Sequence, residues 1–187
     1  MNDSGYLTNQ LLIAMPALGD PNFAQVVALV CDHGPRGALA LIVNKPLPMR
    51  MGEIFDQLEI PIESSPLAER RVLRGGPMQT ERGFVVHPAG AEWDSTLKVS
   101  DRIHVTHSRD VLVAMARGEG PTDAVVALGY AGWDGGQLEE EIRANAWLNA
   151  PLDRGIIFDL PYEARWQAAG RLLGVDLARI SPMSGHA

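Results

Sequence analysis

Apolar residues along the chain gather in short runs separated by Gly and Pro, and these runs predict buried strands. Val26–Asp32 and Ala38–Asn44 are almost continuously apolar, which is typical of strands covered on both faces in the middle of a sheet. His33–Gly37, between them, has the composition of a turn, so the two segments should form a hairpin. The same pattern predicts further strands at Leu11–Met15, Val72–Arg74, Gly83–Val86, Thr96–Val99, Ile103–Thr106, Asp123–Leu128 and Ile156–Phe158.

Apolar residues at helical spacing alternate with these strands. Asp20-Pro21 predicts a single capped turn, and Pro61–Arg71 has the polar, proline-bearing composition of a mobile loop. Ser108 is expected to cap a helix by accepting from its free N–H groups, and Asp134 with Gln137 has the spacing of a capping box. The expected helices are Met51–Leu58, Arg109–Arg117, one from Asp134 to about Trp147, and a last one opened by Pro161 and closed by Gly174.

Consecutive strands are joined partly by turns and partly by helices. This mixture argues for an α+β or mixed α/β domain rather than a doubly wound parallel sheet. The chain has 187 residues and no linker, internal repeat or low-complexity stretch, so residues 1–187 should form one compact α+β domain. Residues 1–9 and 182–187 are expected to be loosely ordered ends.

Charge and cysteine content narrow the class of protein. Acidic residues outnumber basic residues by 23 to 16, for a net charge of −7, and no basic block is present, which disfavours direct nucleic-acid binding. Cys31 is the single cysteine, as is typical of a reducing compartment. The polar start lacks a signal peptide, and the apolar runs are far shorter than the ~20 residues of a membrane span. We expect a cytoplasmic protein without membrane association.

The short motifs of common enzymes are absent from the sequence. There is no Gly-x-x-x-x-Gly-Lys-Ser/Thr phosphate loop, no Gly-x-Ser-x-Gly nucleophile elbow and no His-Glu-x-x-His zinc motif. Gly118-Glu119-Gly120 lacks the third glycine of a dinucleotide fingerprint, and one cysteine cannot build a Cys-rich zinc site. The sequence therefore indicates no catalytic residue, cofactor or metal.

Two segments place cations beside strand ends. Asn44-Lys45-Pro46 follows an apolar strand and would present an amide and an ammonium group at its end, where ligands often bind. Gly75-Gly76 lies between Arg74 and Arg82; paired glycines let a backbone approach a ligand closely, and arginines suit phosphate or carboxylate groups. Tight turns explain both segments more simply, and both interpretations stay open.

Two helix starts supply further candidates. Ser108 and Arg109 begin a predicted helix, where free N–H groups attract an anion, although capping alone would explain Ser108. Gln137 opens a polar stripe with Glu141 and Asn145, which would either line a cleft or face solvent.

The remaining reactive side chains fit structural roles better. Cys31 and His33 would make an activated thiol if they met, but a lone Cys in an apolar strand is usually a packed hydrophobe. His87, His104 and His107 are spaced in a way that does not favour a shared face, so we expect no metal site.

Several of these segments recur in order in one known family. They are Leu12–Pro16, Asp20–Phe23, Gly37–Pro46, Gly75–Pro77, Arg82–His87, Ser108–Leu112, Ala127–Trp133, Gly136–Glu139, Asn145–Leu148, Gly174–Asp176 and Gly185–Ala187. On these residues the chain resembles the YqgE/AlgH family of uncharacterised bacterial proteins almost end to end. The resemblance implies a compact α+β fold with a branched mixed β-sheet, partly barrel-like and surrounded by helices.

The resemblance supplies no activity. Part of the family is named as a regulator of alginate synthesis, which implies a transcriptional role. The chain has no recognisable helix-turn-helix and an acidic balance, so any regulation should act through a protein or a small ligand.

Three hypotheses follow, and the first leads. It is a non-enzymatic regulatory adaptor or small-anion sensor, with an unknown protein partner or a small anionic ligand. The alternative is an enzyme acting on a small anionic or nucleotide-like substrate, which needs a base such as His87 or Glu141 beside the same cations. A weaker alternative is a transcriptional regulator that acts directly on DNA. In the leading hypothesis the binding residues are Asn44, Lys45, Arg74, Gly75, Gly76 and Arg109, with Arg82, Ser108 and Gln137 as further candidates.

Overall fold

The computed structural model describes residues 5–16 and 18–180. Of the ends expected to be loosely ordered, residues 1–4 and 182–187 lie outside these ranges. Residues 5–9 lie inside, where the Leu7 N–H donates to His33 Nδ1 at 2.9 Å and the Asn9 N–H donates to the Val30 carbonyl at 2.9 Å. The segment that precedes the first strand is thus held against the sheet.

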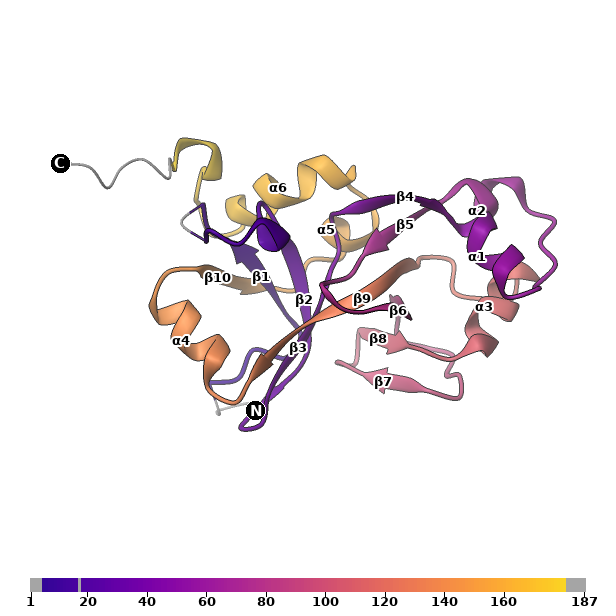
Figure 1. Cartoon of the computed structure of the whole chain (residues 1–187), viewed down its shortest axis with the longest axis horizontal. Helices are drawn as coiled ribbons and strands as arrows, with labels where there is room; N and C mark the ends of the chain where they lie inside the picture. The colour runs from indigo at the N-terminus through magenta and orange to yellow at the C-terminus, as the bar shows by residue number, and fades with distance from the viewer. Residues whose placement is uncertain (1–4, 17, 181–187) are drawn as a thin grey trace.

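Ten strands form one mixed sheet in the described part of the chain (Figure 1). Eight of them follow the order β10-β1-β2-β3-β9-β6-β8-β7, and a branch of β4 and β5 joins at β9. The β5–β9 pairing is parallel and the others are antiparallel. The strands are β1 (Gln10–Ala14), β2 (Val27–Gly34), β3 (Gly37–Ile42), β4 (Pro46–Arg50), β5 (Arg71–Arg74), β6 (Met78–Pro88), β7 (Thr96–Lys98), β8 (Ile103–Thr106), β9 (Val125–Asp134) and β10 (Trp147–Pro151).

The branch exists because the long strand β9 changes neighbours along its length. Ala131–Asp134 pairs with β3, whereas Ala127 and Leu128 lie between β5 and β6. Gly129 separates the two halves with a φ of 78°, a left-handed conformation that suits glycine. The sheet therefore curls into a half-barrel instead of continuing flat.

Helices cover the sheet in three groups (Figure 1). Two cover one face of β1 and β2, one covers the other face, and three gather beside the branch. In that order they are α5 (Arg154–Phe158) and α6 (Arg165–Arg171); α4 (Gln137–Arg143); and α1 (Met51–Gln57), α2 (Ser65–Glu69) and α3 (Arg109–Ala116). Short 3-10 turns are η1 (Pro21–Phe23), η2 (Tyr162–Ala164) and η3 (Leu177–Arg179). None of these helices is long and apolar enough to span a membrane.

Strands with continuous apolar runs contribute side chains to two hydrophobic cores, one on each face of the sheet. Along β1, Leu11 and Ile13 pack under α5 and α6, whereas Leu12 and Ala14 pack under α4. Successive side chains of a strand point to opposite faces, so a strand covered on both sides must be apolar at every position. This confirms the central place expected for the hairpin of β2 and β3, whose Gly34 pairs with Gly37.

Several expected elements need correction. Ile156–Phe158, expected as a strand, belongs to helix α5, where Asp153 caps the Ile156 N–H at 3.1 Å. The helix expected to run to about Trp147 ends at Arg143, because Asn145 takes a φ of 61° and Trp147 begins strand β10. Pro61–Arg71, expected as a loop, contains helix α2, and strand β4 was not anticipated.

Cys31 is a packed hydrophobe and not part of a reactive pair. Its side chain is buried, its Sγ lies 3.5 Å from the Leu29 carbonyl, and both ring nitrogens of His33 have other partners. Burial, followed by the charge of Asp32, raises the pKa of the Cys31 thiol from 9.0 to about 12. The thiol is therefore neutral throughout the physiological range.

A pH titration of stability tests this environment. Above pH 9 the unfolded thiol ionises while the folded thiol holds its proton, so the unfolded state is favoured as the pH rises. We expect the free energy of unfolding to fall by about 1.4 kcal/mol per pH unit between pH 9 and 12 relative to Cys31→Ala. Native protein should also resist a thiol reagent at pH 8. Rapid labelling of the native thiol, or equal pH slopes for the two proteins, would contradict the assignment.

Candidate functional site

The candidate binding residues fall in four separate places. Asn44, Lys45, Arg74, Gly75 and Gly76 meet where β3, β4, β5 and β9 come together. A second place, beside α1 and α3, holds Ser108 and Arg109. Arg82 lies in a third place, with its guanidinium 5.2 Å from the centroid of the Phe84 ring. Gln137 stands alone at the start of α4. Within the described ranges no hydrogen bond or ion pair joins Arg109 to the Lys45 group.

The side chain of Asn44 links the start of β2 to the end of β3. Its Oδ1 accepts from the Val27 N–H at 2.9 Å, and its Nδ2 donates to the Gln25 carbonyl at 2.8 Å. Only 6% of the residue is exposed, and both polar atoms of the amide help to hold β2 against the end of β3. Its first role is therefore structural, and a role in ligand binding stays a prediction.

Gly75 and Gly76 carry the chain across β9. The Gly75 N–H donates to the Leu128 carbonyl at 2.7 Å, and the Ile42 N–H donates to the Gly75 carbonyl at 2.8 Å. A Cβ at Gly75 would overlap the Gly129 carbonyl, and one at Gly76 would overlap the backbone of Tyr130. The close approach that glycine permits here is to the protein's own strand.

Lys45 and Arg74 form a cationic pair beside this crossing. The backbone N–H of Arg74 donates to the backbone carbonyl of Lys45 at 2.8 Å. In the side chain, Arg74 Nη2 donates to the Asn22 carbonyl at 2.7 Å. Arg74 Nη1 is buried and has no hydrogen-bond partner among the residues that the structure describes. Within residues 5–16 and 18–180, neither cation has a carboxylate within 4.0 Å.

The electrostatics of the pair reflect this lack of counter-ions. Burial lowers the pKa of Lys45, and the neighbouring charge of Arg74 lowers the pKa of Lys45 further. Burial also lowers the pKa of Arg74, an effect that the charge of Asp20 opposes. Burial and the neighbouring Arg74 therefore both disfavour the charged form of Lys45.

The second place is a groove of about 470 Å³ between α1 and α3. Ser108 precedes α3 as expected but does not cap it with its side chain. Its hydroxyl donates to Asp110 Oδ1 at 2.5 Å, and Asp110 Oδ1 accepts from the Val111 N–H at 3.0 Å. Asp110 satisfies the helix start instead, because its carboxylate is the better acceptor.

The polar stripe on α4 binds two indoles. Glu141 Oε2 accepts from Trp133 Nε1 at 2.5 Å and from Trp147 Nε1 at 3.1 Å. Gln137 Nε2 donates to Glu141 Oε1 at 3.3 Å, and Gln137 Oε1 accepts from the Asp134 N–H at 3.0 Å. These contacts orient an aromatic cluster, so Glu141 is not a base beside the cations.

Both ring nitrogens of His87 likewise form hydrogen bonds with neighbouring groups. Its Nδ1 donates to the Pro88 carbonyl at 2.9 Å, so its Nε2 accepts from Thr106 Oγ1 at 2.7 Å. Burial lowers the pKa of His87, which keeps the ring neutral. No group of three or more His, Cys, Asp or Glu in the described chain is placed to hold a metal ion.

Sequence reasoning missed one side chain that shapes the strand crossing. Arg165, only 3% exposed, donates from Nη1 to the Val43 carbonyl at 2.8 Å, one residue before Asn44. The available signal was a cation next to Trp166 on the apolar face of the last helix. A charged side chain on the apolar face of a helix is either buried with that face or brought to the surface by a rotation of the helix about its axis.

The fold defines a single-domain α+β protein with a branched, half-barrel sheet. The chain belongs to the AlgH-like family, whose model matches residues 11–178. It is 52% identical to a UPF0301 protein of Thioalkalivibrio sulfidiphilus over 188 residues, which cover 100% of both chains. It is 51% identical to one of Xanthomonas euvesicatoria over 181 residues, covering 97% of this chain and 96% of the relative.

Solved structures agree with this assignment. The solution structure of AlgH from Pseudomonas aeruginosa matches with a TM-score of 0.81 and 42% identity, covering 100% of this chain and 99% of that one. A crystal structure of a Corynebacterium diphtheriae protein matches with a TM-score of 0.72 at 19% identity, covering 97% of this chain and 94% of that one, and shows the shared fold alone. The branched, partly barrel-like sheet expected from the family resemblance is confirmed.

Proposed function

We propose that this AlgH-like protein is a cytoplasmic, non-enzymatic sensor of a small anion that binds between Lys45 and Arg74. One observation carries the proposal. These adjacent, half-buried cations have no carboxylate within 4.0 Å in the described ranges, and Arg74 Nη1 is buried without an acceptor. A buried donor without a partner is unfavourable, and an anionic oxygen supplies both the acceptor and the missing charge.

The surroundings of the pair suit a sensor. Arg74 holds the loop before β2 through Asn22, and Asn44 holds the same loop through Gln25. An anion bound at Arg74 therefore stabilises the conformation of the segment that leads into β2. This segment is then the surface that a protein partner binds. A net charge of −7 supports an effect through such a partner over direct binding to DNA.

A phosphate titration tests the site. With inorganic phosphate at about 100 times its Kd, the wild type should gain about 2.7 kcal/mol, which raises Tm by about 5–10 °C. Lys45→Ala should abolish the shift because it removes half of the cationic pair. The readout is thermal unfolding in phosphate and in chloride at matched ionic strength, with calorimetric titration for the Kd.

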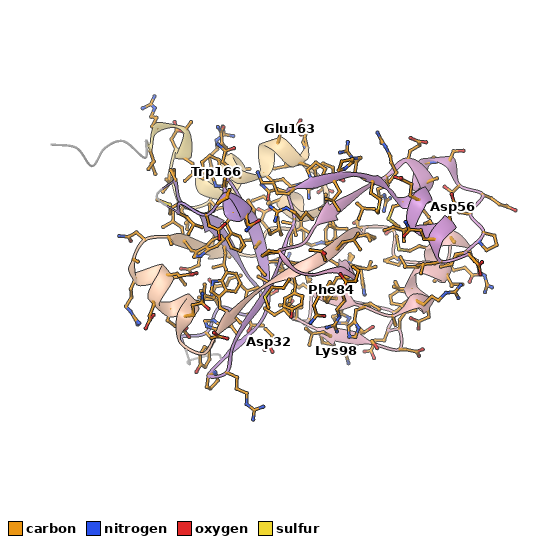
Figure 2. All side chains as sticks on the ribbon, viewed as in Figure 1. Asp32, Asp56, Phe84, Lys98, Glu163 and Trp166 are labelled. Carbon is orange, nitrogen blue, oxygen red and sulfur yellow. The ribbon has the colours of Figure 1, made fainter. Side chains whose placement is uncertain are left out.

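The second lysine of the chain provides a matched control. Lys98 on β7 is exposed (Figure 2), and its Nζ pairs with Glu92 Oε1 at 2.7 Å. Lys98→Ala should therefore keep the full phosphate shift. An equal shift in Lys45→Ala, or no difference between phosphate and chloride in the wild type, would refute an anion site at this pair.

A further inference from the structure

The groove between α1 and α3 is large enough to hold a small molecule. Strands β6 and β9 form its floor, α1 with the end of β4 forms one wall, and α3 with the end of β8 forms the other. These helices lie at the right-hand end of the molecule in Figure 1. The volume of about 470 Å³ falls within the range of about 300–1,000 Å³ that is usual for ligand pockets.

Most of the groove is lined by apolar side chains. Met49, Ile54 and Leu112 contribute from the walls, and Leu128 contributes from the floor. Leu58, at the rim, is 39% exposed although it is a large hydrophobic residue. Gly83 adds no side chain to the floor, which leaves that part open. Apolar surface of this kind favours a ligand with a hydrocarbon body.

Arg109 supplies a cation at the mouth of the groove. Its Nη2 donates to the Leu58 carbonyl at 3.0 Å, which holds the guanidinium between α3 and α1. No carboxylate in the described part of the chain lies within 4.0 Å of Arg109. His107 and Ser108 line the groove next to it. Because a guanidinium has five N–H donors in a planar fork, most of them stay available for a ligand carboxylate.

One carboxylate, Glu81, also lines the groove. Its Oε2 lies 3.5 Å from Thr80 Oγ1, and it has no cation within 4.0 Å among the described residues. Its charge repels a second negative charge on a ligand. Glu81 therefore disfavours a dianionic head such as a phosphate monoester.

We propose that this groove binds a small monocarboxylic acid with an apolar body. The carboxylate pairs with Arg109, and the hydrocarbon part covers Met49, Ile54, Leu112 and Leu128. The site is separate from the Lys45–Arg74 pair and does not depend on it.

Calorimetric titration with octanoate, 1-octanol and octyl phosphate tests the proposal. Octanoate should bind the wild type most tightly of the three. Arg109→Met should weaken octanoate about 10-fold or more and leave octanol unchanged, because only the head contact is lost. Glu81→Gln should tighten octyl phosphate by more than it tightens octanoate, because the dianion bears more of the repulsion.

Two further variants locate the binding. A Cβ at Gly83 would meet Leu128 at an ordinary 3.8 Å, so Gly83→Val should fold and abolish octanoate binding by filling the floor. Lys45→Ala should bind octanoate as the wild type does, which separates this site from the phosphate site. The proposal is overturned if octanoate does not bind, if octanol binds as tightly, or if either Arg109→Met or Gly83→Val leaves octanoate binding unchanged.

Discussion

Replacing Arg165 with Met should lower the free energy of unfolding by about 3–5 kcal/mol. The guanidinium is buried and donates to three carbonyls, those of Leu160 at 2.9 Å, Val43 at 2.8 Å and Ile157 at 2.6 Å. Met fills the space of the side chain but leaves all three acceptors without a donor, and each unsatisfied buried acceptor costs about 1–3 kcal/mol. Urea unfolding followed by circular dichroism measures the loss.

The same helix provides the comparison for Arg165. Arg171→Ala, at the exposed end of α6, should change stability by less than about 0.5 kcal/mol. Arg165→Lys should fall between the two, because an ammonium group keeps the charge but lacks the planar fork that reaches carbonyls in several directions. A loss below about 1 kcal/mol for Arg165→Met would show that the carbonyls find other donors.

Local signals in the sequence were sufficient where neighbouring residues decide the structure. The turn at His33–Gly37 and the helix after Ser108 depend on residues close in the chain, and both are present. The strand predicted at Ile156–Phe158 was wrong because three apolar residues fit a buried strand and a buried helix equally well. There the deciding contact was the cap from Asp153, three residues before Ile156.

The candidate site shows where such reasoning ends. Asn44-Lys45 and Arg74 meet because β4 pairs with β5, which aligns Pro46 with Leu73. Neither the pairing of β4 with β5 nor the parallel pairing of β5 with β9 can be recognised from the spacing of apolar residues in the sequence. Arg109 was grouped with these residues as a cation at a helix start that would attract an anion, and the fold places it against the end of α1. Residue type therefore indicated candidates, whereas long-range pairing decided which of them meet.

Gly76→Ala should lower the free energy of unfolding by more than about 4 kcal/mol or prevent folding. The added Cβ would overlap the carbonyl group of Tyr130, which is backbone within a central strand and cannot rotate away. The expected result is a loss of the cooperative urea transition or a large shift of its midpoint.

Gly83 is the matched control for Gly76, because it lies in the same sheet and, among the described residues, its added Cβ would meet only Leu128 at 3.8 Å. Gly83→Ala should therefore change stability by less than about 1 kcal/mol. Equal effects of the two substitutions would mean that glycine acts through the flexibility of the unfolded chain, which is similar at both positions. A selective loss at Gly76 would instead assign the paired glycines to the crossing over β9, where the chain places Arg74 beside Lys45.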